Sequence, residues 1–329
     1  MVTLADVARQ AGVSSATASR VFGRPEMVGA ETAAKVIDAA DRLGYIANST
    51  ARALALGSSG LIGLVVPQLS SSYFAPLISA VQSEVENSGF ELIIADSRGC
   101  PESEIEIAGR LRGRVDGLVF ASPRSSGAAL ADVARGFPIV TVNRELSDLD
   151  SVRVDVTAGL TELCELLIAR GYRTIAYLGG PEGSLSDDGR FLAVRTAIED
   201  NGGETLRFGP VEPKVSAGTE SFSMLQESDV SAVIAYNALV AHGLMLAAAA
   251  IGAKVPEDLA VVAVDDLIDI GLGLPALTAI TQPMGEAGVW AWRMLVAQVA
   301  RTRRGGPDID TRTAQHLVLP STLVIGETC

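Results

Sequence analysis

The hydrophobic positions between Thr3 and Phe22 follow the spacing of two short helices. Thr3 is a suitable N-cap for a first helix over residues 4–11, and Gly12 can adopt the left-handed conformation that turns the chain sharply. Ser14 then caps a second helix that ends near Phe22. The apolar side chains expected to face each other across this turn are Val7, Ala11, Ala18 and Val21.

A third amphipathic helix is predicted from about Glu31 to Leu43, where Gly44 ends it. Three helices of this size bury only a small core, and such a unit can present one helix to the major groove of DNA. A small helical cap or dimerisation unit would have the same spacing. The outer face of the second helix favours DNA, because short polar groups and one guanidinium suit base edges and phosphates. That face consists of Ser15, Ala16, Ser19 and Arg20.

The pattern changes after residues 57–60, a Gly-Ser stretch with the composition of a linker. Short apolar runs then alternate with helical stretches, which is typical of parallel sheets covered by helices on both faces. The runs assigned to one lobe are 61–66, 91–95, 117–121 and 138–142, and those assigned to a second are 174–179, 232–236 and 259–264. The predicted fold is an all-α headpiece followed by an α/β core of two parallel-sheet lobes. Ligands of such sheets bind outside the carboxyl ends of the strands, so a cleft between the lobes is expected.

Aromatic and polar side chains follow these strands where a ligand would bind. They are Tyr73, Phe74, Asn143, Arg144, Arg190, Asn237 and Asp265. Arginine and aspartate form paired hydrogen bonds with hydroxyls, and an aromatic ring stacks on a sugar's apolar face, so the set suits a small polyhydroxyl ligand. Structural roles are the alternatives: Tyr73 and Phe74 as interlobe core, Asp265 as the cap of the next helix, and Arg190 paired on the surface with Asp187 or Asp188.

Length and composition narrow the class of protein. The 329 residues exceed one ordinary core, so two or three domains are expected. No run of about 18 apolar residues occurs and the start does not resemble a signal peptide, which predicts a cytoplasmic protein without a membrane-spanning helix. The three cysteines are far apart and only two histidines are present, so neither a disulfide framework nor a metal site is expected, and no cofactor is predicted.

The net charge of −13 is unevenly distributed. Residues 1–60 carry six basic and five acidic side chains, whereas the rest carries 20 basic and 34 acidic ones. An acidic body repels nucleic acid, so DNA contacts are expected only at the front of the chain.

The segments TLADVARQAGVSSATASRVF and LGYIANSTARALA resemble the DNA-binding headpiece of the LacI/GalR family of bacterial transcription regulators. The resemblance implies that the second helix reads the major groove through Ser15, Ala16 and Arg20, with Thr3, Ser14, Thr17 and Ser19 near the DNA backbone. It also implies a hinge helix from Asn48 to Leu56, in which Asn48 and Leu54 contact DNA and Leu54 is the minor-groove wedge. Ala47 departs from the family, which usually has proline there.

The resemblance continues through the core, which is similar to the periplasmic-binding-protein-like domain of that family. It implies a headpiece over 1–46, a hinge and linker over 47–60, and a core over 61–329 that crosses between lobes near Asp155, Gln282 and Pro320. The first lobe is then 61–155 with 283–319, and the second 156–282 with 320–329. Arg190 and Asp265 match the family's recurring effector contacts best, and the resemblance also implies contacts at Tyr73, Phe74, Asn143 and Ser186. Ala238 replaces the aspartate of the family's Asn-Asp pair.

The function that follows is a repressor whose affinity for double-stranded operator DNA changes when a small carbohydrate effector binds between the lobes. A homodimer is expected, because no heptad tail for tetramers follows Ile325. A solute-binding protein of a transport system is the alternative, although it would need an export signal. An enzyme is disfavoured, since the glycine-rich stretch over 179–189 fits neither phosphate-binding motif.

Overall fold

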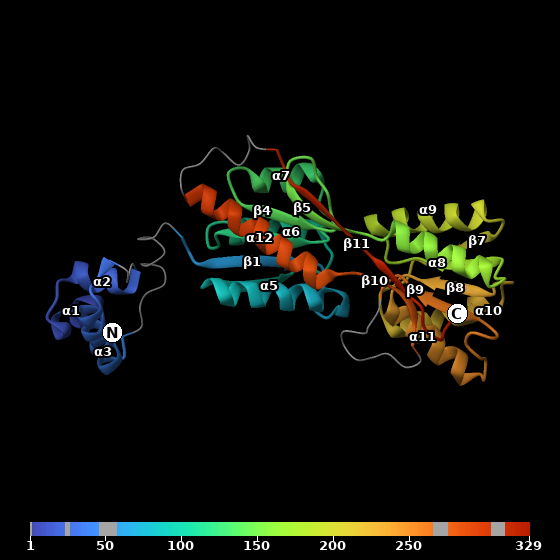
Figure 1. The fold of residues 1–329 in the computed structure, drawn as a ribbon, viewed down its shortest axis with the longest axis horizontal. Helices are drawn as coiled ribbons and strands as arrows, with labels where there is room; N and C mark the ends of the chain where they lie inside the picture. Colours follow the sequence, from blue (N-terminus) through green and yellow to red (C-terminus); the bar gives the residue numbers. More distant parts are fainter. Residues whose placement is uncertain (1, 24–26, 46–57, 266–275, 304–312) are drawn as a thin grey trace.

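The computed structural model describes residues 2–23, 27–45, 58–265, 276–303 and 313–329. The expected hinge helix, including Asn48 and Leu54, lies outside these described residues. Figure 1 shows a helical headpiece and a core of two α/β lobes.

The headpiece consists of α1 (Leu4–Ala11), α2 (Ser15–Gly23) and α3 (Ala30–Leu43), so each predicted helix is confirmed to within about one residue. The turn between α1 and α2 forms as expected, because Gly12 has a φ of 67°. The three helices enclose a small core that consists of Val7, Ala8, Ala18, Val21, Val36, Ala39 and Ala40. Ala11 packs at the edge of this core and is only partly buried.

The first lobe contains a six-stranded sheet with the order β11-β5-β4-β3-β1-β2, in which all neighbouring strands are parallel. In chain order its strands are β1 (Leu61–Val66), β2 (Glu91–Asp96), β3 (Gly117–Ala121), β4 (Ile139–Val142), β5 (Asp150–Asp155) and β11 (His316–Pro320). Alternate residues along β1 and β3 point to opposite faces, and each face is apolar, so helices cover the sheet on both sides.

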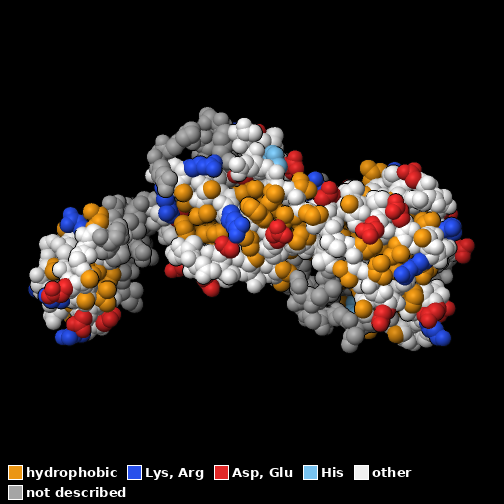
Figure 2. All heavy atoms as spheres, viewed as in Figure 1, with side chains coloured by type: hydrophobic (Ala, Val, Ile, Leu, Met, Phe, Trp, Pro, Cys, Tyr) orange, Lys and Arg blue, Asp and Glu red, His pale blue; other side chains and the backbone are white. Residues whose placement is uncertain are grey.

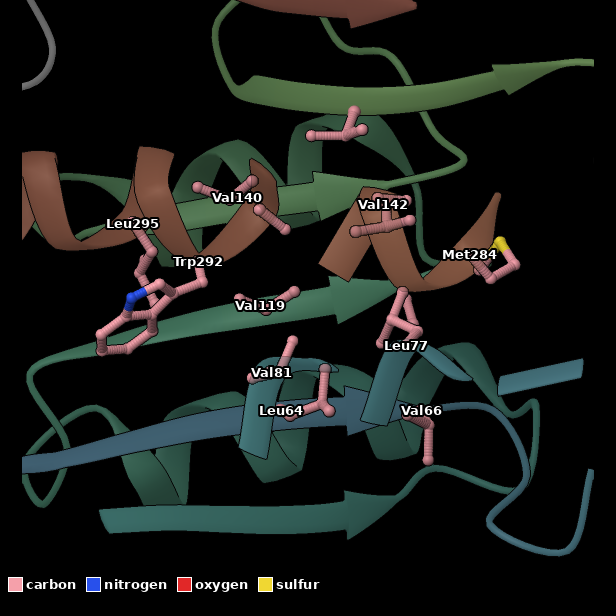
Figure 3. Close-up of a cluster of buried hydrophobic side chains, with 14 of the residues drawn as sticks. Leu64, Val66, Leu77, Val81, Val119, Val140, Val142, Met284, Trp292 and Leu295 are labelled. Carbon is pink, nitrogen blue, oxygen red and sulfur yellow. The ribbon is translucent and has the colours of Figure 1, made fainter. Parts of the chain in front are cut away.

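One face of this sheet packs against α5 (Ala75–Ser88) and α12 (Met284–Arg303), as Figure 3 shows for Leu77, Trp292 and Leu295. The other face packs against α6 (Pro101–Leu111) and α7 (Gly127–Ala134). The α5 and α12 backbones approach closely at Gly288, where a side-chain Cβ would lie 2.8 Å from the Leu77 carbonyl oxygen.

The second lobe repeats this plan, with the strand order β12-β10-β9-β8-β6-β7. Its strands are β6 (Thr174–Leu178), β7 (Glu204–Phe208), β8 (Ala232–Ala235), β9 (Ala260–Ala263), β10 (Thr278–Thr281) and β12 (Thr322–Val324). The helices α8 (Thr157–Ala169) and α9 (Leu185–Asp200) cover one face, and α10 (Val215–Gln226) and α11 (Ala238–Ala250) cover the other. The predicted parallel sheet is present, except that the edge strand β12 runs antiparallel to β10.

All seven predicted strands are present, but five more strands were not predicted: β5, β7, β10, β11 and β12. Three of these lie at sheet edges and the other two lie next to edges. The chain passes between the sheets after β5, after β10 and after β11.

The end of the expected linker is fixed to the first lobe. The Asp116 carboxylate accepts hydrogen bonds from Ser58 Oγ at 2.7 Å and from the backbone N–H groups of Ser59 and Gly60 at 2.9 Å. It also forms an ion pair of 2.9 Å with Arg303 at the end of α12. Partial burial raises the pKa of Asp116, but these hydrogen bonds and Arg303 outweigh it and hold the pKa below its ordinary value.

The surface of the core agrees with its charge. On the face shown in Figure 2, acidic and basic side chains of the two lobes are interspersed, with no continuous basic area. This face of the core therefore offers no extended surface for nucleic acid.

Candidate functional site

A cavity of about 910 Å³ lies between the two lobes. It is bordered in the first lobe by the segments that follow β1, β2, β3, β4 and β5, and in the second by those that follow β6, β7, β8, β9 and β10. The carboxyl ends of both sheets therefore face one space, and its volume suits a small molecule. All eight side chains selected from the sequence line this cavity: Tyr73, Phe74, Asn143, Arg144, Ser186, Arg190, Asn237 and Asp265.

A chain of hydrogen bonds crosses the floor of the cavity from one lobe to the other. Asn143 Nδ2 donates to the Tyr73 hydroxyl, which donates to Gln282 Oε1, and both distances are 2.8 Å. At its ends, Asn143 Oδ1 accepts from the Val154 N–H at 3.1 Å, and Gln282 Nε2 donates to the Val264 carbonyl at 2.6 Å. The chain thus joins β5 of the first sheet to the end of β9 in the second.

Tyr73 and Phe74 have different environments. Phe74 is 7% exposed and belongs to the hydrophobic core of the first lobe, although one edge of it borders the cavity. The two rings pack edge to face with centroids 5.0 Å apart. Burial raises the pKa of the Tyr73 hydroxyl, so that it remains a neutral donor and acceptor. The alternative of a core role is therefore supported for Phe74, within one lobe rather than between lobes.

Arg190 points into the cavity and is not a surface ion pair. Its guanidinium carbon lies 5.4 Å from the centroid of the Tyr236 ring, and its Nε is buried with no hydrogen-bond partner in the part of the chain that the structure describes. The alternative partners are occupied elsewhere, because Asp187 and Asp188 both pair with Arg207, at 2.8 and 3.0 Å. The guanidinium of Arg190 therefore lines the cavity without a carboxylate partner among the described residues, and its donors can bind a ligand oxygen.

Asn237 and Asp265 both cap α11. Asn237 Oδ1 accepts from the Val240 N–H at 2.9 Å, and Asp265 Oδ1 accepts from the Ala238 N–H at 2.5 Å. The capping alternative for Asp265 therefore holds, but the helix is the one after β8 rather than the one after its own strand. Each side chain borders the cavity as well as supporting this helix.

The remaining two candidates lie nearer the rim. Ser186 is exposed and its hydroxyl lies 3.2 Å from that of Ser184. Arg144 is half-buried and donates to the Pro123 carbonyl at 2.8 Å.

A buried carboxylate holds the glycine-rich loop after β6. Asp187 accepts from the Tyr177 hydroxyl at 2.7 Å and from the Gly180 N–H at 2.9 Å, and it pairs with Arg207. This positions the start of α9, from which Arg190 reaches the cavity one turn later. From the sequence, Asp187 was considered only as a surface partner of Arg190. The one signal for a buried role was Tyr177, a tyrosine within a buried strand.

The backbone is strained where the first sheet meets the cavity. Arg98, Ser122 and Asn143 have φ values of 55°, 46° and 58°, and they follow β2, β3 and β4 respectively. All three line the cavity. Left-handed conformations of residues other than glycine are uncommon and concentrate at binding sites. Arg98, Ser122 and the crossing residue Gln282 were not selected from the sequence.

The outer face of α2 is available for DNA. Ser15, Ala16, Ser19 and Arg20 are exposed, whereas Thr17 is half-buried. Thr3 and Ser14 cap helices: Thr3 forms a reciprocal capping box with Asp6, and Ser14 Oγ accepts from the Thr17 N–H at 3.1 Å. Arg20 has no ion pair among the described residues.

Comparison with known proteins decides the class of protein. Residues 3–48 match the model of the bacterial regulatory proteins of the lacI family, and residues 164–329 match a periplasmic binding protein-like domain. The HTH-type transcriptional regulator pepR1 of Lactobacillus delbrueckii subsp. lactis is 30% identical, over 98% of this chain and 96% of its own. The chain belongs to the LacI family.

Solved structures of LacI-family regulators share this architecture. The lac repressor dimer bound to operator and the anti-inducer ONPF is 27% identical, covers 99% of this chain and 98% of its own, and has a TM-score of 0.83. The complex of the transcriptional regulator CelR with cellobiose is 26% identical over the whole of both chains, with a TM-score of 0.70. This LacI-family chain is therefore a DNA-binding transcriptional regulator with two periplasmic-binding-protein-like lobes.

Two absences hold for the described residues alone. They contain no group of three or more histidine, cysteine, aspartate or glutamate side chains that could hold a metal ion. None of their helices is both long enough and apolar enough to cross a membrane.

Proposed function

We propose that this chain is a homodimeric repressor whose affinity for operator DNA is controlled by a small polyhydroxyl effector, a sugar or sugar derivative, in the interlobe cavity. The observation that carries the proposal is the guanidinium of Arg190, which has no carboxylate partner among the described residues and lines a cavity together with Asp265 and Tyr236. A guanidinium, a carboxylate and aromatic rings around one space form a set that recognises vicinal hydroxyls and the apolar face of a sugar ring.

Support for the DNA half comes from α2. Its outer face is small, polar and exposed, with Arg20 able to form paired hydrogen bonds with a guanine edge. The caps at Thr3 and Ser14 leave the first N–H groups of α1 and α2 close to where phosphates would lie. The contacts proposed for Asn48 and Leu54 rest on the family resemblance.

Support for the effector half comes from the relatives together with the cavity. The lac repressor structure contains ONPF and the CelR structure contains cellobiose, so compounds of this size bind to similar proteins. The proposed effector contacts here are Tyr73, Phe74, Asn143, Arg144, Ser186, Arg190, Asn237 and Asp265. Phe74, Asn237 and Asp265 would contribute to binding while also stabilising their own lobes.

DNA binding and effector binding are coupled through the lobes. An effector that contacts both lobes favours one arrangement of them, and this changes the spacing of two headpieces in a dimer. The lac repressor is described as a dimer on its operator, and we propose the same assembly here. The proposed division is a headpiece over 1–46, a hinge over 47–60 and a core over 61–329. A helix-turn-helix headpiece has no use in a solute-binding transport component, so that alternative is not favoured.

Selection of operators from random DNA duplexes tests the DNA half. The full chain should enrich one sequence family with two-fold symmetry, as a dimer with two headpieces requires. Arg20→Ala should not enrich it, whereas Arg42→Ala, an exposed arginine on α3 that pairs with Asp38, should enrich it like wild type. Enrichment of no sequence by wild type would refute the proposal.

A further inference from the structure

We infer that the effector carries an anionic group, a phosphate ester or a carboxylate, and that Arg98, Arg124 and Arg144 of the first lobe bind it. The inference rests on the proposed function, since it concerns the same cavity. It gives the effector an orientation in the cavity, with its anionic group at the first lobe and its hydroxyls at Arg190 and Asp265 of the second.

The three arginines follow three different strands of the first sheet. Arg98 follows β2, Arg124 follows β3 and Arg144 follows β4, and all three line the cavity. Their loops also contact one another. Arg124 Nη1 lies 3.4 Å from the Gly99 carbonyl, directly after Arg98, and Arg144 Nη1 donates to the Pro123 carbonyl, directly before Arg124.

These guanidinium groups have no carboxylate partner among the described residues, although carboxylates are close in the chain. Asp96 accepts instead from the backbone N–H groups of Leu69 and Arg98, at 3.0 and 2.7 Å. Glu145 and Asp155 both face Arg153, at 3.8 and 3.6 Å. Asp96, Glu145 and Asp155 are therefore engaged with other partners, and each of the three arginines retains donors that an anion in the cavity can use.

A buried carboxylate shapes the loop that carries Arg124. Glu104 on α6 is 1% exposed and accepts from the N–H groups of Arg124 and Ser125, at 2.9 and 2.8 Å. It also accepts from the Ser125 hydroxyl at 2.6 Å. These bonds use the backbone of Arg124 and leave its guanidinium directed elsewhere, so Glu104 positions the loop without neutralising the arginine.

The three arginines carry like charges into one space. The chain beyond residue 60 has 34 acidic and 20 basic side chains, and the ion pairs of its described part use Arg135, Arg153, Arg207 and Arg303 but none of these three. Guanidinium groups that line one cavity repel one another, and an anion that binds among them relieves that repulsion. Phosphate and carboxylate groups both accept paired hydrogen bonds from guanidinium.

Inorganic phosphate is the simplest probe of this cluster. We expect phosphate at about 20 mM, a concentration on the order of the millimolar dissociation constants of simple anions, to raise the melting temperature of the full chain. The reference sample contains chloride at equal ionic strength. Phosphate stabilises proteins generally by exclusion, so the comparison is made with the double variant Arg124→Gln/Arg144→Gln. The added stabilisation should vanish in the double variant and persist in Arg110→Gln, a control on the exposed side of α6.

Matched sets of sugars then distinguish a phosphate ester from a carboxylate as the anionic group. They also separate a failure of this inference from a failure of the proposed function. Glucose, glucose 6-phosphate and glucuronate, with the corresponding ribose and galactose compounds, are titrated calorimetrically. We expect at least one anionic member to bind, with its affinity falling about tenfold for each guanidinium removed. Preference for phosphate or for carboxylate identifies the source.

Two results would overturn the inference. One is equal phosphate stabilisation of wild type and the double variant. The other is a neutral sugar that binds wild type and the double variant equally while its anionic counterparts bind more weakly. The second result would leave the proposed function intact, because Arg190→Ala would still abolish binding of that sugar. Operator selection in which wild type enriches no sequence would instead refute the proposed function.

Discussion

Replacing Tyr73 with phenylalanine should weaken the junction between the lobes. The Tyr73 hydroxyl joins Asn143 Nδ2 to Gln282 Oε1, with both distances 2.8 Å. Its removal leaves one donor and one acceptor without this partner, and an unsatisfied buried group costs about 1–3 kcal/mol. Part of the cost is recovered if the Gln282 amide shifts or water enters the cavity, so we expect a total loss of about 1–3 kcal/mol in the free energy of unfolding.

Urea unfolding followed by tryptophan fluorescence measures this loss. Trp290 and Trp292 both lie on α12, which packs on the first lobe, so their emission reports on that lobe. The matched control is Tyr172→Phe in the second lobe, whose hydroxyl has no hydrogen bond within the described part of the chain. A loss no larger than that of the control would mean that this hydroxyl does not hold the lobes together.

Three further predictions concern the headpiece, the hinge and the linker. Arg20→Ala should weaken specific operator binding by about 1–3 kcal/mol in fluorescence anisotropy if the side chain reads a base, and wild-type affinity would reject that role. Leu54→Ala should reduce operator bending in a circular-permutation gel while effector affinity stays the same, and unchanged bending would reject the wedge. Asp116 has a lowered pKa, so its stabilising contribution is present above the ordinary aspartate pKa and is lost as the pH falls through the lowered value. The melting temperatures of wild type and Asp116→Asn should therefore differ at neutral pH and converge in acid, and a constant difference would contradict this assignment.

The strands that sequence reasoning found are those with continuous apolar runs. β1, β3, β8 and β9 are buried along nearly their whole length, which is the pattern that central strands of parallel sheets impose. β7 and β12 lie at edges of the second sheet and are only partly buried, so polar residues interrupt their pattern. Edge strands lack two-sided burial, and the edge strand β2 was recognisable only because its residues are nearly all apolar.

β5 was missed for another reason, because it is mostly buried and yet begins and ends with aspartate. Asp150 is 2% exposed, and its carboxylate accepts from Gln298 Nε2 at 2.9 Å and from the Gln315 N–H at 2.7 Å. Both partners are more than 140 residues away in the chain. No local pattern announces that a charged residue will be satisfied by such distant donors.

The cavity was predictable to the extent that its residues end predicted strands. Asn143, Asn237 and Asp265 follow such strands directly, and the structure brings them to one space. Gln282 follows β10, which was not predicted, and Arg124 lies in a loop whose course depends on the buried Glu104. Their place in the cavity follows from tertiary contacts that the sequence pattern does not contain.

We propose that a ligand in the interlobe cavity changes the affinity for operator DNA. The most direct measurement is the operator dissociation constant, with and without a saturating cavity ligand, for wild type, Arg190→Ala and the control Arg195→Ala, an exposed arginine on the same helix. We expect a change of about fivefold or more in wild type and in the control, and no change in Arg190→Ala. An operator affinity that stays constant in wild type while the ligand occupies the cavity, or an undiminished response in Arg190→Ala, would contradict it.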